Sequence, residues 1–156
     1  MRWVVLILAG VLVGCGPKDE GKTGGGDADA PFAAAQIIVD RVSSGHESLE
    51  RLTLHAVPAG KTECTQIAST MVERRGKPSD PEDLEALGTG QEIVLDEDGA
   101  VDVTVPILVV DGKPTAIAGV TLTMEEGADR DALVEEARAI AQELEKEIRA
   151  VGKSVW

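Results

Sequence analysis

The stretch Val101 to Met124, VDVTVPILVVDGKPTAIAGVTLTM, decides the fold. Two runs rich in Val, Ile and Thr, at 101–110 and 115–124, flank the pair Asp111-Gly112. β-branched residues favour strands, and an Asp-Gly pair between two such runs is typical of a tight hairpin turn. The stretch therefore predicts an antiparallel hairpin, to which the other elements are added.

The residues before this hairpin predict one more strand and a short helix. Glu92 to Leu95 is a short β-prone run, and Asp98-Gly99 is a turn that would connect it to the hairpin. Farther upstream, Asp80 can cap free N–H groups of a helix in which Pro81 suits the first turn. We expect this helix to end at Gly88 to Gly90.

The first part of the domain predicts a long helix followed by two strands. Apolar residues recur at helical spacing between about Phe32 and Leu52, which indicates one amphipathic helix over that range. Thr53 to Val57 and Glu63 to Thr70 are predicted as strands, joined by the turn-forming residues 58–61 (Pro-Ala-Gly-Lys).

The last segment, Asp129 to Val151, predicts a helix with one apolar face and an exposed ion pair between Glu145 and Arg149. The apolar face consists of Leu133, Ala137, Ile140, Leu144, Ile148 and Val151. The complete order predicts a single α+β domain at 31–156. It has a five-stranded antiparallel sheet, a long N-terminal helix, a short middle helix and a C-terminal helix.

The N-terminal residues predict an export signal. Arg2 is followed by an uncharged run from Trp3 to Val13, which is of signal-peptide length and shorter than the roughly 20 residues that span a membrane. The tetrapeptide Leu12-Val13-Gly14-Cys15 resembles a bacterial lipobox, which implies cleavage after residue 14 and acylation of Cys15, with chains such as palmitate. Residues 15–30 would then be the lipidated cysteine and a flexible Gly- and Asp-rich tether.

We therefore expect a lipoprotein that is attached to a membrane by its N-terminal lipid and lies outside the cytoplasm. Gly16 after the cysteine resembles lipoproteins of the outer membrane, so the expected location is its periplasmic face. Removing residues 1–14 removes one charge, that of Arg2, so the net charge of −13 becomes −14. Such an acidic chain is not expected to bind nucleic acid.

The element order, together with Arg75 to Leu84 (RGKPSDPEDL) and Val103 to Ile107 before Asp111-Gly112-Lys113, resembles extracytoplasmic Cache sensor domains, whose architecture is PAS-like and profilin-like. The resemblance covers about residues 32–124 and includes the later strand Ala118-Gly119-Val120. It implies a sensor domain that binds a small ligand but has no signalling output of its own. The ligand clamps of amino-acid-binding members are not recognisable, so the resemblance names no ligand.

The candidate ligand site lies at the start of the short helix. Its residues are Arg74, Arg75, Lys77 and Ser79, which could receive a carboxylate or a similar anion together with the helix N–H groups. The alternative is that Asp80 and Asp83 already occupy this helix end and that the basic residues pair with neighbouring acids.

Three other functions are open. His46, His55 and Cys64 could hold a metal or haem if the fold brought them together, although even spacing in sequence does not imply proximity. The apolar face of the last helix could bind a protein partner or form a homodimer. A Cys64 nucleophile with a His55 base, or an Asp96 and Asp98 pair, would be enzymatic, but neither has a supporting motif. We therefore expect no enzyme and no cofactor.

Overall fold

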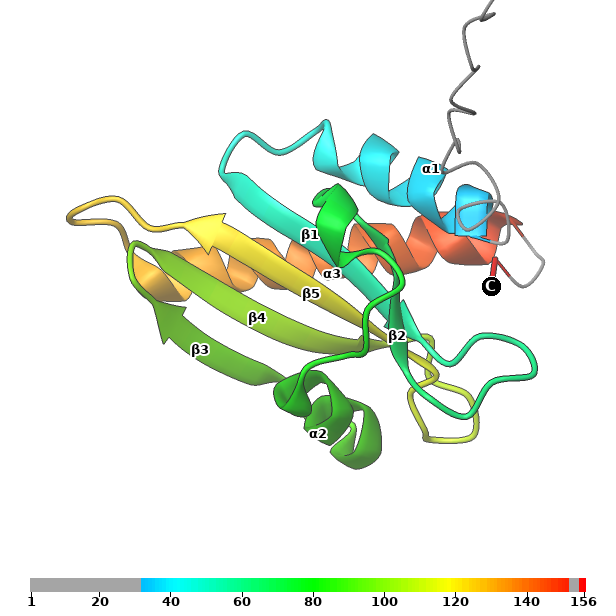
Figure 1. The fold of residues 1–156 in the computed structure, drawn as a ribbon. Coiled ribbons are helices and arrows are strands. Elements are labelled where there is room, and N and C mark those ends of the chain that lie inside the picture. The colour runs from blue at the N-terminus through cyan, green and yellow to red at the C-terminus, as the bar shows by residue number, and fades with distance from the viewer. Residues whose placement is uncertain (1–31, 152–154) are drawn as a thin grey trace, which may run out of the picture.

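Five strands join in one antiparallel sheet, with the order β2-β1-β5-β4-β3, in a computed structural model that describes residues 32–151 and 155–156 (Figure 1). The elements are α1 (Ala33–Ser43), β1 (Leu49–Ala56), β2 (Thr65–Ser69), the 3-10 helix η2 (Val72–Arg74), α2 (Pro81–Thr89), β3 (Ile93–Glu97), β4 (Ala100–Ile107), β5 (Ala116–Thr123) and α3 (Arg130–Val151). The predicted α+β class and five-stranded sheet are confirmed. The predicted signal at 1–14, Cys15 and the tether to residue 30 lie outside the described residues.

The predicted hairpin at 101–124 is present as β4 and β5. Its strands pair from Ala100 opposite Thr123 to Ile107 opposite Ala116. At the turn Asp111 and Gly112 both have positive φ, 50° and 76°, and Val110 N–H donates to the Lys113 carbonyl over 2.8 Å. Positive φ at both central residues suits the right-handed twist of paired strands, which explains the Asp-Gly pair.

The predicted long N-terminal helix is wrong in its second half. The helix α1 ends at Ser43, and Leu49 and Leu52 belong to β1. As a central strand, β1 pairs with both β2 and β5. Its backbone N–H and C=O groups therefore form hydrogen bonds to two neighbouring strands, which a helix at this position could not make. Leu52 is still buried in the core, because it lies on the apolar face of β1. Its spacing from the apolar residues of α1 fits a helix as well as a strand, so the pattern alone did not distinguish the two.

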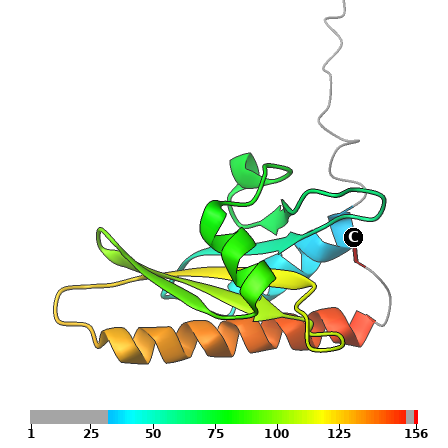
Figure 2. The same cartoon turned by 90° about the horizontal axis from the view of Figure 1, so that it is seen from below.

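One face of the sheet is apolar and is covered by α1 and α3, as the edge-on view shows (Figure 2). Leu52, Leu54, Val103, Val120 and Leu122 project from the strands into this core. From α3 the core receives Val134, Ala137, Ile140, Ala141, Leu144 and Ile148. The predicted apolar face of this helix is therefore mostly buried within the chain, with Leu133 partly buried and Val151 exposed. That the helix binds a protein partner or forms a homodimer stays a prediction. The predicted ion pair is confirmed, with Arg149 Nη2 at 2.5 Å from Glu145 Oε1.

The opposite face of the sheet is polar and lies under α2 and the segment 70–80 (Figures 1 and 2). The start of α2 is held by a reciprocal capping box. The Asp80 side chain accepts from the backbone of Asp83, and Asp83 Oδ2 accepts from Asp80 N–H over 2.9 Å. Gly90, with φ of 70°, ends the helix. The predicted middle helix, with Asp80 as its cap, is thus confirmed.

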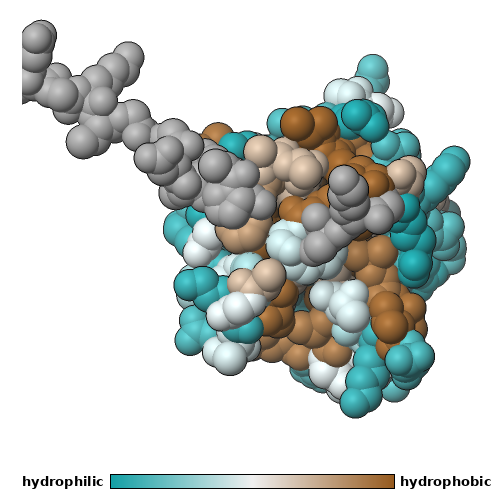
Figure 3. Space-filling model, turned by 90° about the vertical axis from the view of Figure 1, so that its right-hand side faces the viewer, coloured by the Kyte–Doolittle hydropathy of each residue, from teal (hydrophilic) through white to brown (hydrophobic). Residues whose placement is uncertain are grey.

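No helix in the described part of the chain has the length and apolar character needed to cross a membrane. Several apolar side chains are nevertheless exposed at one end of the molecule, on the tip of the β4–β5 hairpin and at the end of β1. They are Val109, Val110 and Val57. Figure 3 views this end and shows apolar residues gathered across it.

Candidate functional site

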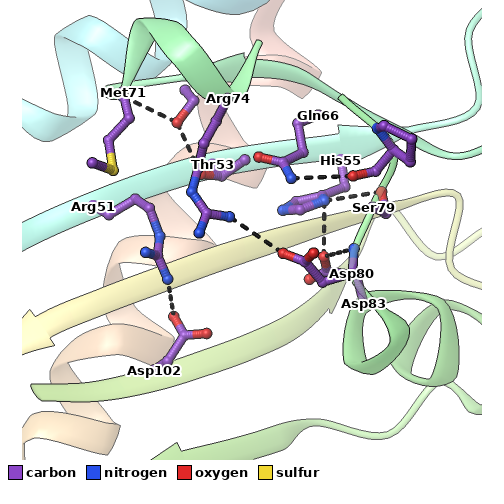
Figure 4. Close-up of polar contacts among 12 residues, drawn as sticks. Arg51, Thr53, His55, Gln66, Met71, Arg74, Ser79, Asp80, Asp83 and Asp102 are labelled. Carbon is purple, nitrogen blue, oxygen red and sulfur yellow. Dashed lines mark hydrogen bonds and ion pairs between the residues drawn. The ribbon is translucent and has the colours of Figure 1, made fainter. Parts of the chain in front are cut away.

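A buried polar cluster connects the sheet to the start of α2. His55 of β1 lies with its Nδ1 atom 3.0 Å from Ser79 Oγ and 3.1 Å from Asp83 Oδ2 (Figure 4). Ser79 Oγ also donates to Cys64 Sγ over 3.2 Å. All four residues are buried, so each polar atom depends on another for its hydrogen bonds.

Burial shifts the pKa of each ionisable group in this cluster so that the neutral form is favoured. Desolvation lowers the pKa of His55 to about 4, although the nearby Asp80 carboxylate opposes the shift. Desolvation raises the pKa of Asp83 to about 7, against the stabilising hydrogen bond from the Asp80 backbone. Burial likewise raises the pKa of the Cys64 thiol. Near pH 7 the cluster is therefore a neutral histidine and thiol beside a carboxyl group that is close to its midpoint.

Ser79, His55 and Asp83 do not form a proton relay, although they are the residue types of a hydrolase triad. A relay needs the serine on one ring nitrogen and the carboxylate on the other. Here both partners share Nδ1, and Nε2 points toward Gly119, where a Cβ atom would lie only 3.3 Å away. The glycine therefore leaves room for the ring.

A second polar group crosses the same face four residues along β1 from His55. Arg51 and Asp102 both lie opposite Thr121 in the sheet register. Thr121 Oγ1 donates to Asp102 Oδ1 over 2.6 Å, and Arg51 Nη2 is 3.5 Å from the same oxygen. This carboxylate is mostly buried and is balanced by the arginine.

Two cavities flank these groups and meet at the ion pair between Arg74 and Asp80, whose atoms Nη1 and Oδ2 are 3.2 Å apart. The sheet cavity, of about 50 Å³, lies over Arg51, Thr53, His55 and Gly119. The outer cavity, of about 580 Å³, is lined by Gln66, Met71, Glu73, Arg74, Lys77, Pro78, Ser79 and Asp80. The side chains of Arg74 and Asp80 are both partly exposed, so a ligand can compete for either of them.

Gln66 of β2, which lines the outer cavity, also holds a buried acceptor without a partner. It is only 2% exposed, and its Nε2 atom donates to the Pro78 carbonyl over 3.2 Å. Among the described residues, its Oε1 is the one buried side-chain N or O atom that lacks a hydrogen-bond partner. Figure 4 shows this oxygen on the side of the carboxamide that faces Thr53 and Arg74.

The structure brings together three of the four residues that the sequence proposed as a ligand site. Arg74, Lys77 and Ser79 all line the outer cavity, although Ser79 contributes its hydroxyl to the buried cluster. Arg75 does not line it. Its Nε–H donates to the Ser69 carbonyl, and its side chain borders a separate, apolar cavity of about 240 Å³ beside α1. The alternative, in which the basic residues pair with neighbouring acids, holds for Arg74, which pairs with Asp80.

The three proposed metal-ligating residues lie in two places. His46 Nε2 is 3.1 Å from Glu143 on α3, whereas His55 and Cys64 meet at Ser79. Within residues 32–151 and 155–156, no group of three or more His, Cys, Asp or Glu side chains is arranged to hold a metal ion. Asp96, proposed as half of an acid pair, contacts Arg130 over 2.6 Å instead.

Sequence reasoning missed most of the polar face. Arg51, Asp83 and Asp102 were not proposed as site residues, His55 was proposed only as a metal ligand or catalytic base, and Gln66 was not singled out. One signal was present: Arg51, Thr53 and His55 alternate with Leu52 and Leu54, which is the period of a strand with one polar face. Because the residues up to Leu52 were predicted to be helical, this alternation was not recognised as part of a longer strand.

Comparison with known proteins identifies the type of fold only. No known protein family matches the sequence, and no curated protein matches it. Among solved structures, the GAF domain/HD domain protein from Geobacter sulfurreducens matches with a TM-score of 0.51 and 13% identity, over 80% of this chain and 93% of that one. The fold is GAF-like.

Two further solved structures match with lower scores. A putative GAF sensor protein from Burkholderia vietnamiensis has a TM-score of 0.49 and 18% identity, over 77% of this chain and 80% of that one. The type II free methionine-R-sulfoxide reductase from Thermoplasma acidophilum has a TM-score of 0.48 and 9% identity, over 76% and 95%. The GAF-like fold is related to the PAS-like fold, so the predicted resemblance is confirmed at the level of a PAS-like fold, and its finer assignment to Cache sensor domains stays a prediction.

Proposed function

We propose that this GAF-like domain is a sensor module that binds a small polar ligand in the outer cavity. The observation that carries the proposal is the part-exposed ion pair of Arg74 and Asp80 in the wall of this cavity, beside Glu73 and Lys77. A polar or charged ligand can compete for either partner of this pair, because an ion pair that is part exposed contributes little free energy.

The wall of the outer cavity is held in place before any ligand binds. Gln66 N–H donates to the Lys77 carbonyl over 2.9 Å, Gly76 N–H donates to Gln66 O over 2.8 Å, and Ser79 N–H donates to Cys64 O over 3.1 Å. These backbone bonds fasten segment 76–79 to β2 and to Cys64 just before it. A preformed wall lowers the conformational entropy that binding must overcome, which supports a binding role for this segment.

The polar cluster supports binding rather than catalysis, and we propose that the domain is not an enzyme. The shared Nδ1 atom of His55 deprives Ser79 of a relay, and burial raises the pKa of the Cys64 thiol, which lowers its thiolate fraction. The cluster instead positions the capped start of α2 against the sheet.

A thermal-shift screen of small polar metabolites would test the ligand proposal. Ligands of the outer cavity should stabilise the mature chain, and saturation at 100 times the Kd adds about 2.7 kcal/mol. The variant Arg74→Gln should lose the shift, whereas the matched variant Arg75→Gln should keep it, because Arg75 borders the other cavity. If every stabilising compound protects both variants equally, the outer cavity is not the ligand site.

We further propose that the module is a lipoprotein of Cache type, tethered through Cys15 and facing the periplasm from the outer membrane. The lipobox-like residues 12–15 support this. The apolar end of the domain also supports it. Phe32, the first described residue, borders a cavity with Pro58 and Lys61 of the β1–β2 loop, so the chain enters the domain at the end where Val109 and Val110 are exposed (Figures 1 and 3).

Metabolic labelling with a palmitate analogue, followed by membrane fractionation, would test the tether. The natural sequence should carry the label and sediment with outer membranes, and Cys15→Ser should lose both properties. The control Cys64→Ser should retain them, because Cys64 is buried in the domain. An unlabelled product that keeps Met1 would refute the lipoprotein proposal.

A further inference from the structure

We infer that the apolar end of the domain lies against the surface of the phospholipid bilayer to which the chain is tethered. The apolar end consists of the loop between β1 and β2, at 57–64, and the tip of the β4–β5 hairpin, at 108–115. The inference rests on the proposed lipoprotein and goes beyond it, because a tether alone does not fix which side of the domain faces the membrane. Its basis is two consecutive exposed valines, Val109 and Val110, at the same end as the exposed Val57.

The backbone of the hairpin tip holds the two valines outward. Leu108 has a positive φ of 56°, which non-glycine residues seldom adopt, and its side chain is only 9% exposed. A regular strand would point successive side chains to opposite faces, whereas here Leu108 stays inside and Val109 and Val110 are both more than half exposed. The Leu108 carbonyl accepts from Thr115 Oγ1 over 2.8 Å, and Leu108 N–H donates to Glu145 Oε1 over 3.1 Å. The fold therefore fixes an apolar tip.

The distribution of charge favours this end over the opposite one as the side that faces a bilayer. The two loops of the apolar end carry two lysines, Lys61 and Lys113, and two acids, so their net charge is zero. At the opposite end of the sheet, the segments 96–98 and 125–131 carry seven acids and one arginine. A bilayer that contains anionic lipids attracts lysines and repels acids, so the acidic end points away from it.

The chain also enters the domain at the apolar end. Phe32 borders a cavity with Pro58 of the β1–β2 loop. The hairpin tip lies at the same end of the sheet, because Ala56, the last residue of β1, pairs with Ala116, the first residue of β5 (Figures 1 and 3). Sixteen residues separate Cys15 from Phe32, and a chain of that length spans at most about 55 Å when extended and about 22 Å on average when flexible. A bilayer held at that distance meets the apolar end first.

Fluorescent labels at two matched alanines would test the inference, with the mature, acylated chain in vesicles of phosphatidylethanolamine and phosphatidylglycerol. Ala59 of the β1–β2 loop and Ala128 of the β5–α3 loop are both exposed and lie at opposite ends of the sheet. An environment-sensitive dye is attached to Ala59→Cys or to Ala128→Cys, and the buried Cys64 of the unaltered chain serves as the labelling blank.

We expect the dye on Ala59→Cys to shift its emission to shorter wavelength and to be quenched by lipids that carry a quencher on their acyl chains. The dye on Ala128→Cys should keep the emission that it has in water. Equal signals from the two positions would overturn the inference.

Substitutions at the valines would show whether they make the contact. With the dye on Ala59→Cys, the double variant Val109→Asp with Val110→Asp should lose both the shift and the quenching, because an ionised side chain is costly to place in hydrocarbon. The control Leu95→Asp changes a partly exposed apolar residue of β3 and should retain both signals. Undiminished quenching in the double variant would contradict contact through the valines.

A second copy of the chain is the other occupant that would shield the apolar end. Contact with lipid does not depend on the ratio of protein to lipid, whereas contact between two copies weakens as the chain is diluted in the bilayer. A signal from Ala59→Cys that disappears on dilution would therefore overturn the inference.

The mass of the labelled chain separates failure of this inference from failure of the proposed function. An acylated chain whose dye on Ala59→Cys remains in water refutes the inference and leaves the lipoprotein proposal standing. A chain without acyl groups refutes both.

Discussion

The two faces of the sheet are both largely buried but chemically opposite. On one face β1, β4 and β5 present only aliphatic side chains to α1 and α3, among them Leu54, Val103 and Val120. On the other face the same strands present Thr53, His55, Asp102, Thr104 and Thr121, which are nearly as inaccessible. Period-two alternation allows one strand to serve both, because successive side chains point to opposite faces.

The two faces differ in what burial demands. Aliphatic side chains gain free energy from burial in any well-packed arrangement, at roughly 25 cal/mol for each Å². Buried polar side chains must each find a partner with suitable geometry. The apolar face can therefore stabilise the fold in many arrangements of its side chains, whereas the polar face fixes the positions of the groups that pair on it.

The largest expected effect is on the apolar face. Leu144 of α3 is fully buried, so Leu144→Ala should lower the free energy of unfolding by about 2–5 kcal/mol through lost burial and the cavity left behind. Urea denaturation would measure it. The control Leu84→Ala, at a residue of α2 that is 49% exposed, should cost less than about 1 kcal/mol. Similar losses for both would contradict the assignment of the core to this face.

The polar face should show its effect in the pH dependence of stability. In His55→Gln only the raised pKa of Asp83 remains, so the folded state takes up its proton near pH 7 and the unfolded state near pH 4. Stability should then rise as the pH falls from 8 to 4. In Asp83→Asn only the lowered pKa of His55 remains, the unfolded state is protonated first, near pH 6.5, and stability should fall over the range from 6.5 to 4.

The slopes of the two variants should thus have opposite signs, with a limit of about 1.4 kcal/mol for each pH unit. In the unaltered chain the two contributions oppose each other and should flatten the profile. Urea midpoints at intervals of half a pH unit would measure this. Slopes of the same sign in both variants would show that burial does not control these two groups.

A smaller effect is expected where the polar face leaves room for a ring. Gly119→Ala places a Cβ atom 3.3 Å from His55 Nε2, a tight contact that should cost about 1 kcal/mol. The backbone of Gly119 lies outside the left-handed region, so the cost should arise from the ring alone. A double-mutant cycle with His55→Ala would check this, because the penalty should vanish when the imidazole is absent.

The smallest effect belongs to the outer surface of α3, beyond both faces. Arg149→Ala removes the exposed pair with Glu145 and should cost about 0.3–0.5 kcal/mol. Repeating the denaturation at 1 M salt should reduce this loss, because the pair is screened. A loss of more than 1 kcal/mol would mean that this surface contributes to the core.

The sequence by itself determined the elements whose signals are local. The Asp-Gly turns, the capping residues Asp80 and Pro81, and the apolar face of α3 all act through neighbours in the chain, and the structure contains each of them. The cluster of Arg74, Lys77 and Ser79 was predictable for the same reason, because a helix start and the loop before it lie together in any fold.

Only the tertiary structure decided where β1 begins and what faces the cavities. Leu49 and Leu52 fit a helix or a strand equally well, and the ladders with β2 and β5 settled the choice. His55, Asp83 and Gln66 come from three elements, and only their packing brought them under one segment, with Arg75 turned to the other side. Periodicity assigns a residue to a face within its own element, whereas a site between elements depends on contacts between distant residues, which no local pattern encodes.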